Sequence, residues 1–314
     1  MATNIKSSTF TYKDQDGIEI NVYKWEPESS PKAAIQIIHG MAEHGKRYER
    51  IAGFLCNNGY ICYADDHRGH GKTIELNNMP PGYLGESGWD GTVKAIHQLS
   101  TIIKEQHPQI PLFLIAHSWG SFMCQDIMQR WSPEYNGVVL SGSSGSQSST
   151  QLKIVKTIAK KQIKKLGPKE PSEKMDDLIF DRYNKPFKKE PGATRHEWLS
   201  RDKGEVQKYI DDPLSGFICP ASFWLEMFTA FDKIWDIENE RKISVDLPIL
   251  FISGTFDSNS NNTKNLKPLL ERYRKVGIRE VGVKFFEEAR HEIFNEINRE
   301  EVYNFVLDWL NSHL

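Results

Sequence analysis

A serine stands where a buried strand meets a helix in the stretch PLFLIAHSWGSFMCQDIMQRW, residues 111–131. The apolar run at 112–116 predicts a strand, and a helix-like pattern begins directly after Ser118. Ala116, Ser118 and Gly120 form a G-x-S-x-G pattern with alanine first, typical of a nucleophile elbow that exposes a serine hydroxyl above a sheet. A serine that caps a helix N-terminus explains these five residues equally well.

A serine hydroxyl becomes a useful nucleophile only beside a base that is itself oriented by an acid. In elbow-type enzymes the acid and then the histidine follow the serine in the chain, each after a later strand. Asp257 follows the predicted strand in LPILFISGTFDSNS, and His291 follows the one in VGVKFFEEARHEIFNE. Asp246 precedes its strand and would lie at the wrong end of the sheet. A turn role for Asp257 and a helix-start role for His291 are the alternatives, but the three together predict acyl transfer.

The oxyanion of an acyl-transfer intermediate requires two fixed N–H donors. We expect one from the amide of Trp119, at the positive end of the helix after the serine. We expect the other in HGMAEHGKRY, where Gly40 lets the backbone approach and Met41 supplies the amide. His39 and Glu43 are expected to brace this loop, and a plain turn is the alternative for the whole segment.

The segment DDHRGHG, residues 65–71, is the remaining dense cluster of polar residues. His67 and His70 with an aspartate suggest a metal, but no further cluster is spaced to complete a ligand shell. The glycines and the position after a strand favour a structural loop beside the site. We therefore expect no metal and no cofactor.

The composition is that of an ordinary globular protein, with 39% hydrophobic and 26% charged residues among 314. A net charge of -2 argues against a nucleic-acid partner. No apolar run approaches the ~20 residues of a spanning helix, and the N-terminal stretch has no secretory signal. The four cysteines form no CxxC pair: they are Cys56, Cys62, Cys124 and Cys219. We therefore expect buried free thiols in a protein of a reducing, cytoplasmic compartment.

Strands and helices are expected to alternate along most of the chain, and these elements would position the candidate site residues. A hairpin is expected around Asp16-Gly17. Continuous apolar runs favour parallel strands covered on both faces, in KAAIQIIHG, YICYAD, LFLIA, GVVLSG, LPILFISG and VGVKFF. Helical spacing is found in RYERIAGFLCNNG, TVKAIHQLSTIIKEQ, the segment after Ser118 and REEVYNFVLDWLNSHL.

The alternation stops in a polar, lysine-rich segment at 147–237. It predicts a helical cap inserted between two strands of one sheet, so that the core consists of 1–146 and 238–314. The amphipathic helix Leu152–Leu166 carries six lysines. It is either a lid that meets anionic lipid or, as we favour, a solvated helix packed on the cap.

The cap is also rich in aromatic residues, notably in FICPASFWLEMF. Packing of the cap onto the core explains each of them singly. The cluster has more apolar surface than that role requires, so we expect Phe217 and Trp224 to line an acyl channel together with Trp119.

Taken together, HGMAEHGKRY, DHRGHG, AHSWGS, FISGTFD and ARHEIFNE resemble the α/β-hydrolase family of monoacylglycerol lipases and lysophospholipase-like, serine aminopeptidase-like hydrolases. WLSRD and DDPLSGF resemble its bacterial members. The resemblance implies an α/β-hydrolase fold and the same roles: Ser118 nucleophile, Asp257 acid, His291 base, and Met41 and Trp119 oxyanion donors.

Two departures from the family pattern concern the substrate pocket and the acid loop. Relatives usually have Gly-His-Ser-Met-Gly where this chain has Ala116 and the far bulkier Trp119. They usually have Asp-Pro-Val where this chain has Asp257, Ser258 and Asn259.

These observations predict a serine esterase or lipase that acts on monoacylglycerol-like or lysophospholipid-like esters through an acyl-enzyme. The alternatives are an amidase or peptidase with the same triad, and a ligand-binding protein of this fold with little turnover. The expected partner is a small-molecule ester or lipid, with no nucleic acid, no stable membrane insertion and at most transient membrane contact through the cap.

Overall fold

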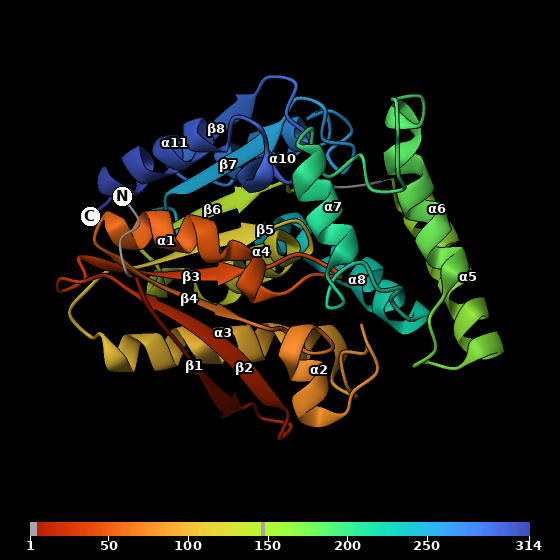
Figure 1. Ribbon diagram of the computed structural model, residues 1–314, viewed down its shortest axis with the longest axis horizontal. Coiled ribbons are helices and arrows are strands. Elements are labelled where there is room, and N and C mark those ends of the chain that lie inside the picture. Colours follow the sequence, from red (N-terminus) through yellow and green to blue (C-terminus); the bar gives the residue numbers. More distant parts are fainter. Residues whose placement is uncertain (1–4, 146–147) are drawn as a thin grey trace.

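A single eight-stranded sheet forms the centre of the molecule (Figure 1). The computed structural model describes residues 5–145 and 148–314. The strand order is β1-β2-β4-β3-β5-β6-β7-β8; β1 pairs antiparallel with β2, β2 pairs antiparallel with β4, and the remaining pairs are parallel. The strands span Lys6–Lys13 (β1), Glu19–Glu26 (β2), Ala33–Ile38 (β3), Tyr60–Asp65 (β4), Leu112–His117 (β5), Gly137–Ser141 (β6), Ile249–Gly254 (β7) and Val281–Phe286 (β8).

Helices cover both faces of this sheet, which explains why β3, β4, β5, β6 and β7 are buried along their whole length. One apolar cluster joins one face to α1 (Glu49–Asn57) and α11 (Arg299–Asn311). The other cluster joins the opposite face to α3 (Gly88–Gln106), α4 (Trp119–Trp131) and α10 (Leu266–Lys275). The predicted fold class, an α/β-hydrolase fold with a mostly parallel sheet, is confirmed.

The order of the strands places several loops together. Strand β4 lies on one side of β3 and β5 lies on the other side. The chain therefore leaves β3 in one direction and β5 in the opposite direction, which makes a topological switch point between these two strands. Crevices at such points, outside the carboxyl ends of the strands, are where open α/β sheets bind ligands. Gly40 follows β3 and Ser118 follows β5, while Asp257 and His291 follow β7 and β8.

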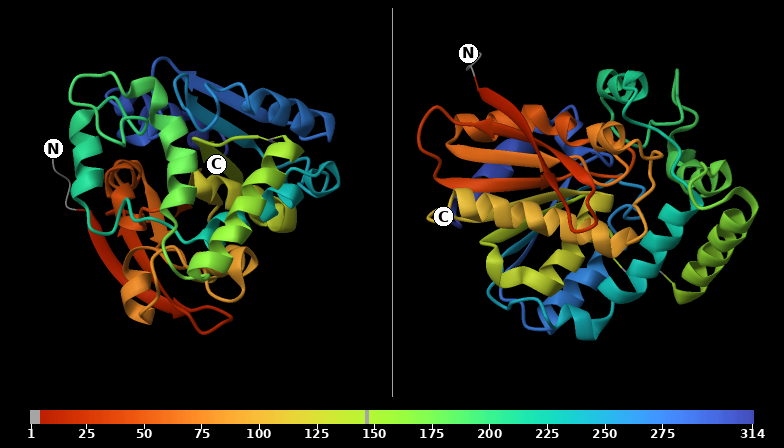
Figure 2. Two further views of the ribbon diagram at one scale, coloured as in Figure 1. Left: turned by 90° about the vertical axis from the view of Figure 1, so that its right-hand side faces the viewer. Right: turned by 90° about the horizontal axis from the view of Figure 1, so that it is seen from below.

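The segment between β6 and β7 contains helices and lies at the end of the sheet to which the parallel strands point (Figures 1 and 2). We call residues 148–240 the insertion. The predicted start of the cap, at 147, falls outside the described residues, and its predicted end, at 237, coincides with the first residue of its last helix. The helices are α5 (Ser149–Leu166), α6 (Glu173–Asn184), α7 (Lys203–Asp211), α8 (Ala221–Ile234) and α9 (Ile237–Glu240).

The lysine-rich helix α5 packs against α8 of the same insertion. Leu152 and Ala159 are buried in this contact, and Lys156 of α5 pairs with Asp232 of α8. Most of the other lysines face solvent. This arrangement agrees with the favoured interpretation of a solvated helix packed on its neighbours.

Outside the insertion, helices α2 (Gly71–Asn77) and α10 were not predicted from the sequence. Helix α2 is short and has only two buried residues, so it carries no apolar stripe. Helix α10 contains Pro268 and many charged residues, although four residues at helical spacing are buried: Leu266, Leu269, Leu270 and Tyr273.

Candidate active site

Ser118 adopts a strained backbone conformation at the start of α4. Its φ is 52° and its ψ is -121°, a backbone region that residues other than glycine rarely adopt. The Ser118 amide donates to the carbonyl of Ser141 in the neighbouring strand β6 at 2.9 Å. A Cβ on Gly120 would lie 2.3 Å from the carbonyl oxygen of His39, so α4 can approach β3 only with glycine there. These features are those of a nucleophile elbow.

The three predicted triad residues meet at the carboxyl ends of their strands. His291 Nε2 lies 2.8 Å from Ser118 Oγ, and His291 Nδ1 lies 2.9 Å from Asp257 Oδ1. Asp257 also accepts from the amide of Asn259 at 2.9 Å and from the hydroxyl of Ser253 at 3.3 Å. An ionised Asp257 can only accept, so Nδ1 carries the proton and Nε2 is free to accept from the serine hydroxyl.

The charges around His291 favour its protonated form. Burial by itself lowers the pKa of His291, but the charge of Asp257 and its hydrogen bond, with further contributions from Glu292 and Glu43, raise that pKa overall above its ordinary value. A base with a raised pKa holds more firmly the proton that it takes from a nucleophile.

The predicted oxyanion donors are the backbone amides of Met41, in the loop after β3, and of Trp119, the first residue of α4. In the part of the chain that the structure describes, neither the Met41 amide nor the Trp119 amide donates to a protein acceptor. His39 Nε2 accepts from the amide of His67 at 3.0 Å, so its Nδ1 carries the proton and donates to the Gly40 carbonyl at 2.7 Å. Because the N–H of a trans peptide points away from its C=O, this bond also directs the Met41 N–H.

A buried ion cluster links the loop of Met41 to the loop of His291. Glu43 accepts from the amide of Gly40 at 2.5 Å and pairs with Arg47. Arg47 also binds both oxygens of Glu292, the residue after His291, at 2.8 Å each. Although burial opposes the ionisation of Glu292, Arg47 lowers its pKa to about 2. Sequence reasoning assigned the bracing role to Glu43 but missed Arg47 and Glu292.

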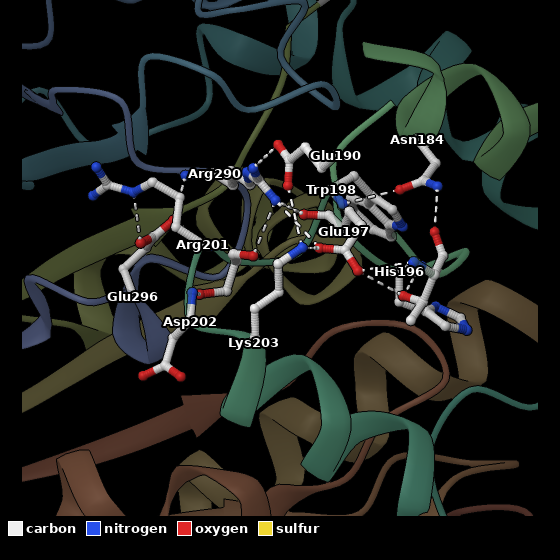
Figure 3. Close-up of polar contacts among 12 residues, drawn as sticks. Asn184, Glu190, His196, Glu197, Trp198, Arg201, Asp202, Lys203, Arg290 and Glu296 are labelled. Carbon is white, nitrogen blue, oxygen red and sulfur yellow. Dashed lines mark hydrogen bonds and ion pairs between the residues drawn. The ribbon is translucent and has the colours of Figure 1, made fainter. Parts of the chain in front are cut away.

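The loop that carries His291 is bonded to the insertion, and Figure 3 shows part of this contact, between Arg290 and the two acids Glu190 and Glu197. The amides of His291 and Glu292 donate to the carbonyls of Trp198 and Leu199, at 3.3 and 2.7 Å. The Trp198 ring packs on the His291 imidazole, with centroids 4.8 Å apart. Arg290 donates to the Glu197 carbonyl at 2.6 Å and pairs with Glu190 and Glu197. The WLSRD motif therefore contacts the loop of His291, a contact that its residue types did not reveal.

The acid loop is also joined to the insertion. Tyr183 of α6 donates its hydroxyl to Asn259 Oδ1 at 2.9 Å, and Ser258 donates to the Tyr183 carbonyl at 2.8 Å. Asn259 Nδ2 in turn donates to the Gly142 carbonyl at 2.8 Å. These bonds hold Asp257 in place without the proline that relatives usually have at the next position.

The polar cluster at residues 65–71 is a structural loop. His67 Nδ1 contacts Asp65 at 2.7 Å and its ring stacks on His39 at 3.7 Å between centroids. Asp66 accepts from the amides of Gly45 and Lys72, at 2.8 and 2.9 Å. Among the described residues there is no group of three or more His, Cys, Asp or Glu side chains that could hold a metal ion.

A cavity of about 260 Å³ opens above Ser118 between the core and the insertion. Its wall is mostly apolar, and Trp224 of α8 contributes to it. Trp119 also lines the cavity, although its side chain is only 1% exposed and stacks on His70 at 5.1 Å. The apolar wall comes from α5, α6 and α8, with Ile154, Val155, Leu178, Ile179, Phe180, Trp224, Met227, Phe228 and Phe231.

Phe217 corrects one expectation from the sequence. It is not among the cavity-lining residues of the described chain; its ring packs against His70, with centroids 5.3 Å apart. Phe217 belongs to the irregular segment before α8, and its ring contacts the loop of residues 65–71 and not the cavity. The aromatic content of FICPASFWLEMF predicted apolar contacts correctly but could not tell which ring faces which partner.

Comparison with known proteins identifies relatives along almost the whole chain. The sequence model of the family described as serine aminopeptidase, S33, matches residues 29–298. A monoacylglycerol lipase of Mycolicibacterium smegmatis is 25% identical over 311 residues, covering 98% of each chain. A human monoglyceride lipase is 26% identical over 306 residues, covering 94% of this chain and 86% of the relative.

Solved structures show the same fold. A thermostable carboxyl esterase from Bacillus coagulans, solved in complex with glycerol, superposes with a TM-score of 0.88 at 24% identity and covers 98% of each chain. A monoglyceride lipase from Saccharomyces cerevisiae superposes with a TM-score of 0.74 at 20% identity, covering 99% of this chain and 97% of that one. With the family match over residues 29–298, this chain belongs to the serine aminopeptidase, S33, family of the α/β-hydrolase superfamily.

Proposed function

We propose that the protein is a serine hydrolase that cleaves carboxylic esters with a single apolar acyl chain, such as monoacylglycerols or lysophospholipids. The observation that carries this proposal is the continuous hydrogen-bonded row from Ser118 through His291 to Asp257 beside an apolar cavity. The relatives named as monoacylglycerol and monoglyceride lipases support the same class of reaction.

In the proposed mechanism the Ser118 hydroxyl attacks the ester carbonyl while His291 Nε2 takes its proton. Asp257 holds the imidazole through Nδ1 and stabilises the imidazolium. The Met41 and Trp119 amides bind the oxyanion of the tetrahedral intermediate. His291 returns the proton to the departing alcohol, leaving an acyl-enzyme. Water, activated by the same histidine, then releases the carboxylic acid.

The shape and chemistry of the cavity support an acyl substrate. Helices of the insertion supply a mostly apolar wall, which favours a hydrocarbon chain by about 0.8 kcal/mol for each buried methylene. Exposed Ile154 and Leu178 lie where the cavity meets solvent, at 55% and 41% exposure. We therefore expect the enzyme to prefer acyl chains of a certain length. We also expect the polar alcohol group of the ester to lie outside the apolar wall.

A series of p-nitrophenyl esters from acetate upward, run beside a monoacylglycerol and a lysophospholipid, tests this proposal. We expect kcat/KM to rise with each carbon until the cavity is full, and turnover of at least one of the two lipids. Equal rates for acetate and longer esters, with neither lipid turned over, would refute the substrate class.

A peptidase is the second candidate, because the family is described as serine aminopeptidase. An aminopeptidase requires an anion for the substrate's amino group. Two carboxylates, Glu43 and Glu292, line the cavity, but both are paired with Arg47. We therefore favour the ester substrate. Hydrolysis of aminoacyl p-nitroanilides faster than of the matched esters would reverse this preference, and no product burst with either would favour a ligand-binding protein.

Transient contact with a lipid surface is part of the same proposal. No helix in the described chain is long and apolar enough to cross a membrane. Ile154 and Leu178 at the cavity mouth, together with the exposed lysines of α5, support brief contact during substrate uptake. All four cysteines are free and buried, which supports the predicted reducing, cytoplasmic location. Co-sedimentation with anionic vesicles of wild type and Ile154→Asp tests the contact.

A further inference from the structure

The backbone at Ala42 is held in an unfavourable conformation directly beside the proposed oxyanion donor Met41. Its φ is 52°, in the left-handed region, and the residue is 4% exposed. Non-glycine residues persist in this region where the surrounding structure over-determines them. The contacts that hold Ala42 are therefore informative about how the loop is built.

The Ala42 carbonyl accepts two hydrogen bonds, and both donors belong to the insertion. Tyr209 of α7 donates its hydroxyl at 3.1 Å, and Gly216 donates its amide at 2.9 Å. Gly216 belongs to the DDPLSGF motif at residues 211–217, and Tyr209 lies just before it. The proposed reaction has not so far explained this motif. Tyr209 is 7% exposed and lines the cavity, so its hydroxyl is aimed at the loop from the substrate side.

Neighbouring contacts join the same two segments. His44 Nε2 lies 2.7 Å from Asp212 Oδ2, and the guanidinium of Arg47 lies over the Tyr209 ring at 4.9 Å. Asp212 also accepts from the Leu214 amide at 2.9 Å, which shapes the turn that presents Gly216. The HGMAEHGKRY loop and the segment from Tyr209 to Gly216 thus form one interlocked unit.

We propose that Tyr209 is a positioning residue that sets the oxyanion loop, so that the insertion takes part in catalysis as well as covering the cavity. This inference rests on the proposed function. The loop is anchored at Gly40 by Glu43 and His39 of the core, and at Ala42 by Tyr209 and Gly216 of the insertion. Met41 lies between the two anchors, and its amide direction depends on both.

The variant Tyr209→Phe removes one hydroxyl and keeps the ring that lines the cavity. Complete loss of an oxyanion donor costs about 10²- to 10³-fold in kcat, so a partly displaced Met41 amide should cost about tenfold. We expect KM for a p-nitrophenyl ester to stay within about twofold. The affinity for a trifluoromethyl ketone, which forms a tetrahedral adduct, should fall by the same factor as kcat.

Tyr83→Phe is the matched control, because the Tyr83 hydroxyl contacts Glu86 outside the cavity. It should retain wild-type kcat and inhibitor affinity. A rise in KM for Tyr209→Phe, with kcat and inhibitor affinity unchanged, would overturn the inference and leave Tyr209 as a wall of the cavity.

Hydrogen exchange separates a failure of this inference from a failure of the proposed reaction. The peptide that contains residues 40–43 should exchange faster in Tyr209→Phe than in wild type or Tyr83→Phe, whether or not the protein hydrolyses esters. If Ser118→Ala retained activity, the proposed reaction would fail, and this comparison would still decide the role of Tyr209. Unchanged exchange would contradict the inference.

Discussion

The proposed nucleophile, Ser118, and the loops of its proposed partners are held in place by different parts of the molecule. Ser118 is fixed by the core: it follows β5, its amide pairs with β6, and Gly120 lets α4 touch β3. The loops of Ala42, Asp257 and His291 are also held by the insertion, through Tyr209, Tyr183 and Trp198. The difference implies that the core alone fixes the position of Ser118, whereas the positions of Ala42, Asp257 and His291 depend on the insertion as well.

The largest expected effect separates the two aspartates on either side of β7. Asp257→Asn removes the acceptor that fixes the His291 tautomer, and we expect a loss of about 10⁴-fold in kcat. Asp246 lies before β7 in an exposed ion pair with Arg279, so Asp246→Asn should stay within about twofold of wild type. Matched kinetics in which Asp246→Asn is the weaker enzyme would show that the acid is misassigned.

Two glycines at the second position of a helix compare the core with the insertion directly. At Gly120 in α4 a methyl group would meet backbone oxygens at 2.3 and 2.4 Å, whereas at Gly204 in α7 the nearest atom is a carboxylate oxygen of Asp202 at 3.2 Å. We expect Gly120→Ala to destabilise the fold by about 2–3 kcal/mol and to lower activity. Gly204→Ala should change stability by no more than about 1 kcal/mol. Urea unfolding measures both, and equal losses would contradict the tight contact at the elbow.

The pH dependence of activity tests the ion cluster that joins the two loops. Only neutral His291 can take a proton, so kcat/KM should rise with pH through the raised pKa of His291, above about 6.5. Removing one negative charge in Glu292→Gln lowers this pKa, and the acidic limb should move to lower pH. Glu271→Gln is the control, because the Glu271 side chain is on the exposed face of α10. An acidic limb that does not move in Glu292→Gln would mean that the cluster has no electrostatic effect on the base.

The smallest expected effect concerns the length of the acyl chain. Trp119→Met and Trp224→Leu should move the optimum toward longer esters, since each additional buried methylene is worth about fourfold in kcat/KM. Phe217→Leu should leave the optimum unchanged, because the Phe217 ring packs on His70 away from the cavity. A shifted optimum in Phe217→Leu would overturn that placement. An unchanged optimum in Trp119→Met would mean that only the backbone amide of Trp119 takes part.

The features that sequence reasoning predicted well have local signals. Apolar runs marked the buried strands, and the chain order of Ser118, Asp257 and His291 placed each residue after a strand. The contacts that it missed join segments distant in the sequence: Arg47 with Glu292, Ala42 with Tyr209, and His291 with Trp198. No pattern within either segment announces such a pairing, because it depends on how the insertion folds back over the core. The same reason explains why Phe217 was assigned to the wrong surface.

Labelling with a fluorophosphonate, followed by mass spectrometry of the modified peptide, tests the central claim most directly. A single adduct on Ser118 in the wild type, with neither labelling nor ester turnover in Ser118→Ala, is the predicted result. Loss of the serine in comparable enzymes costs about 10⁶-fold in kcat. An adduct on another residue, or more than a few per cent of wild-type turnover in Ser118→Ala, would contradict the account.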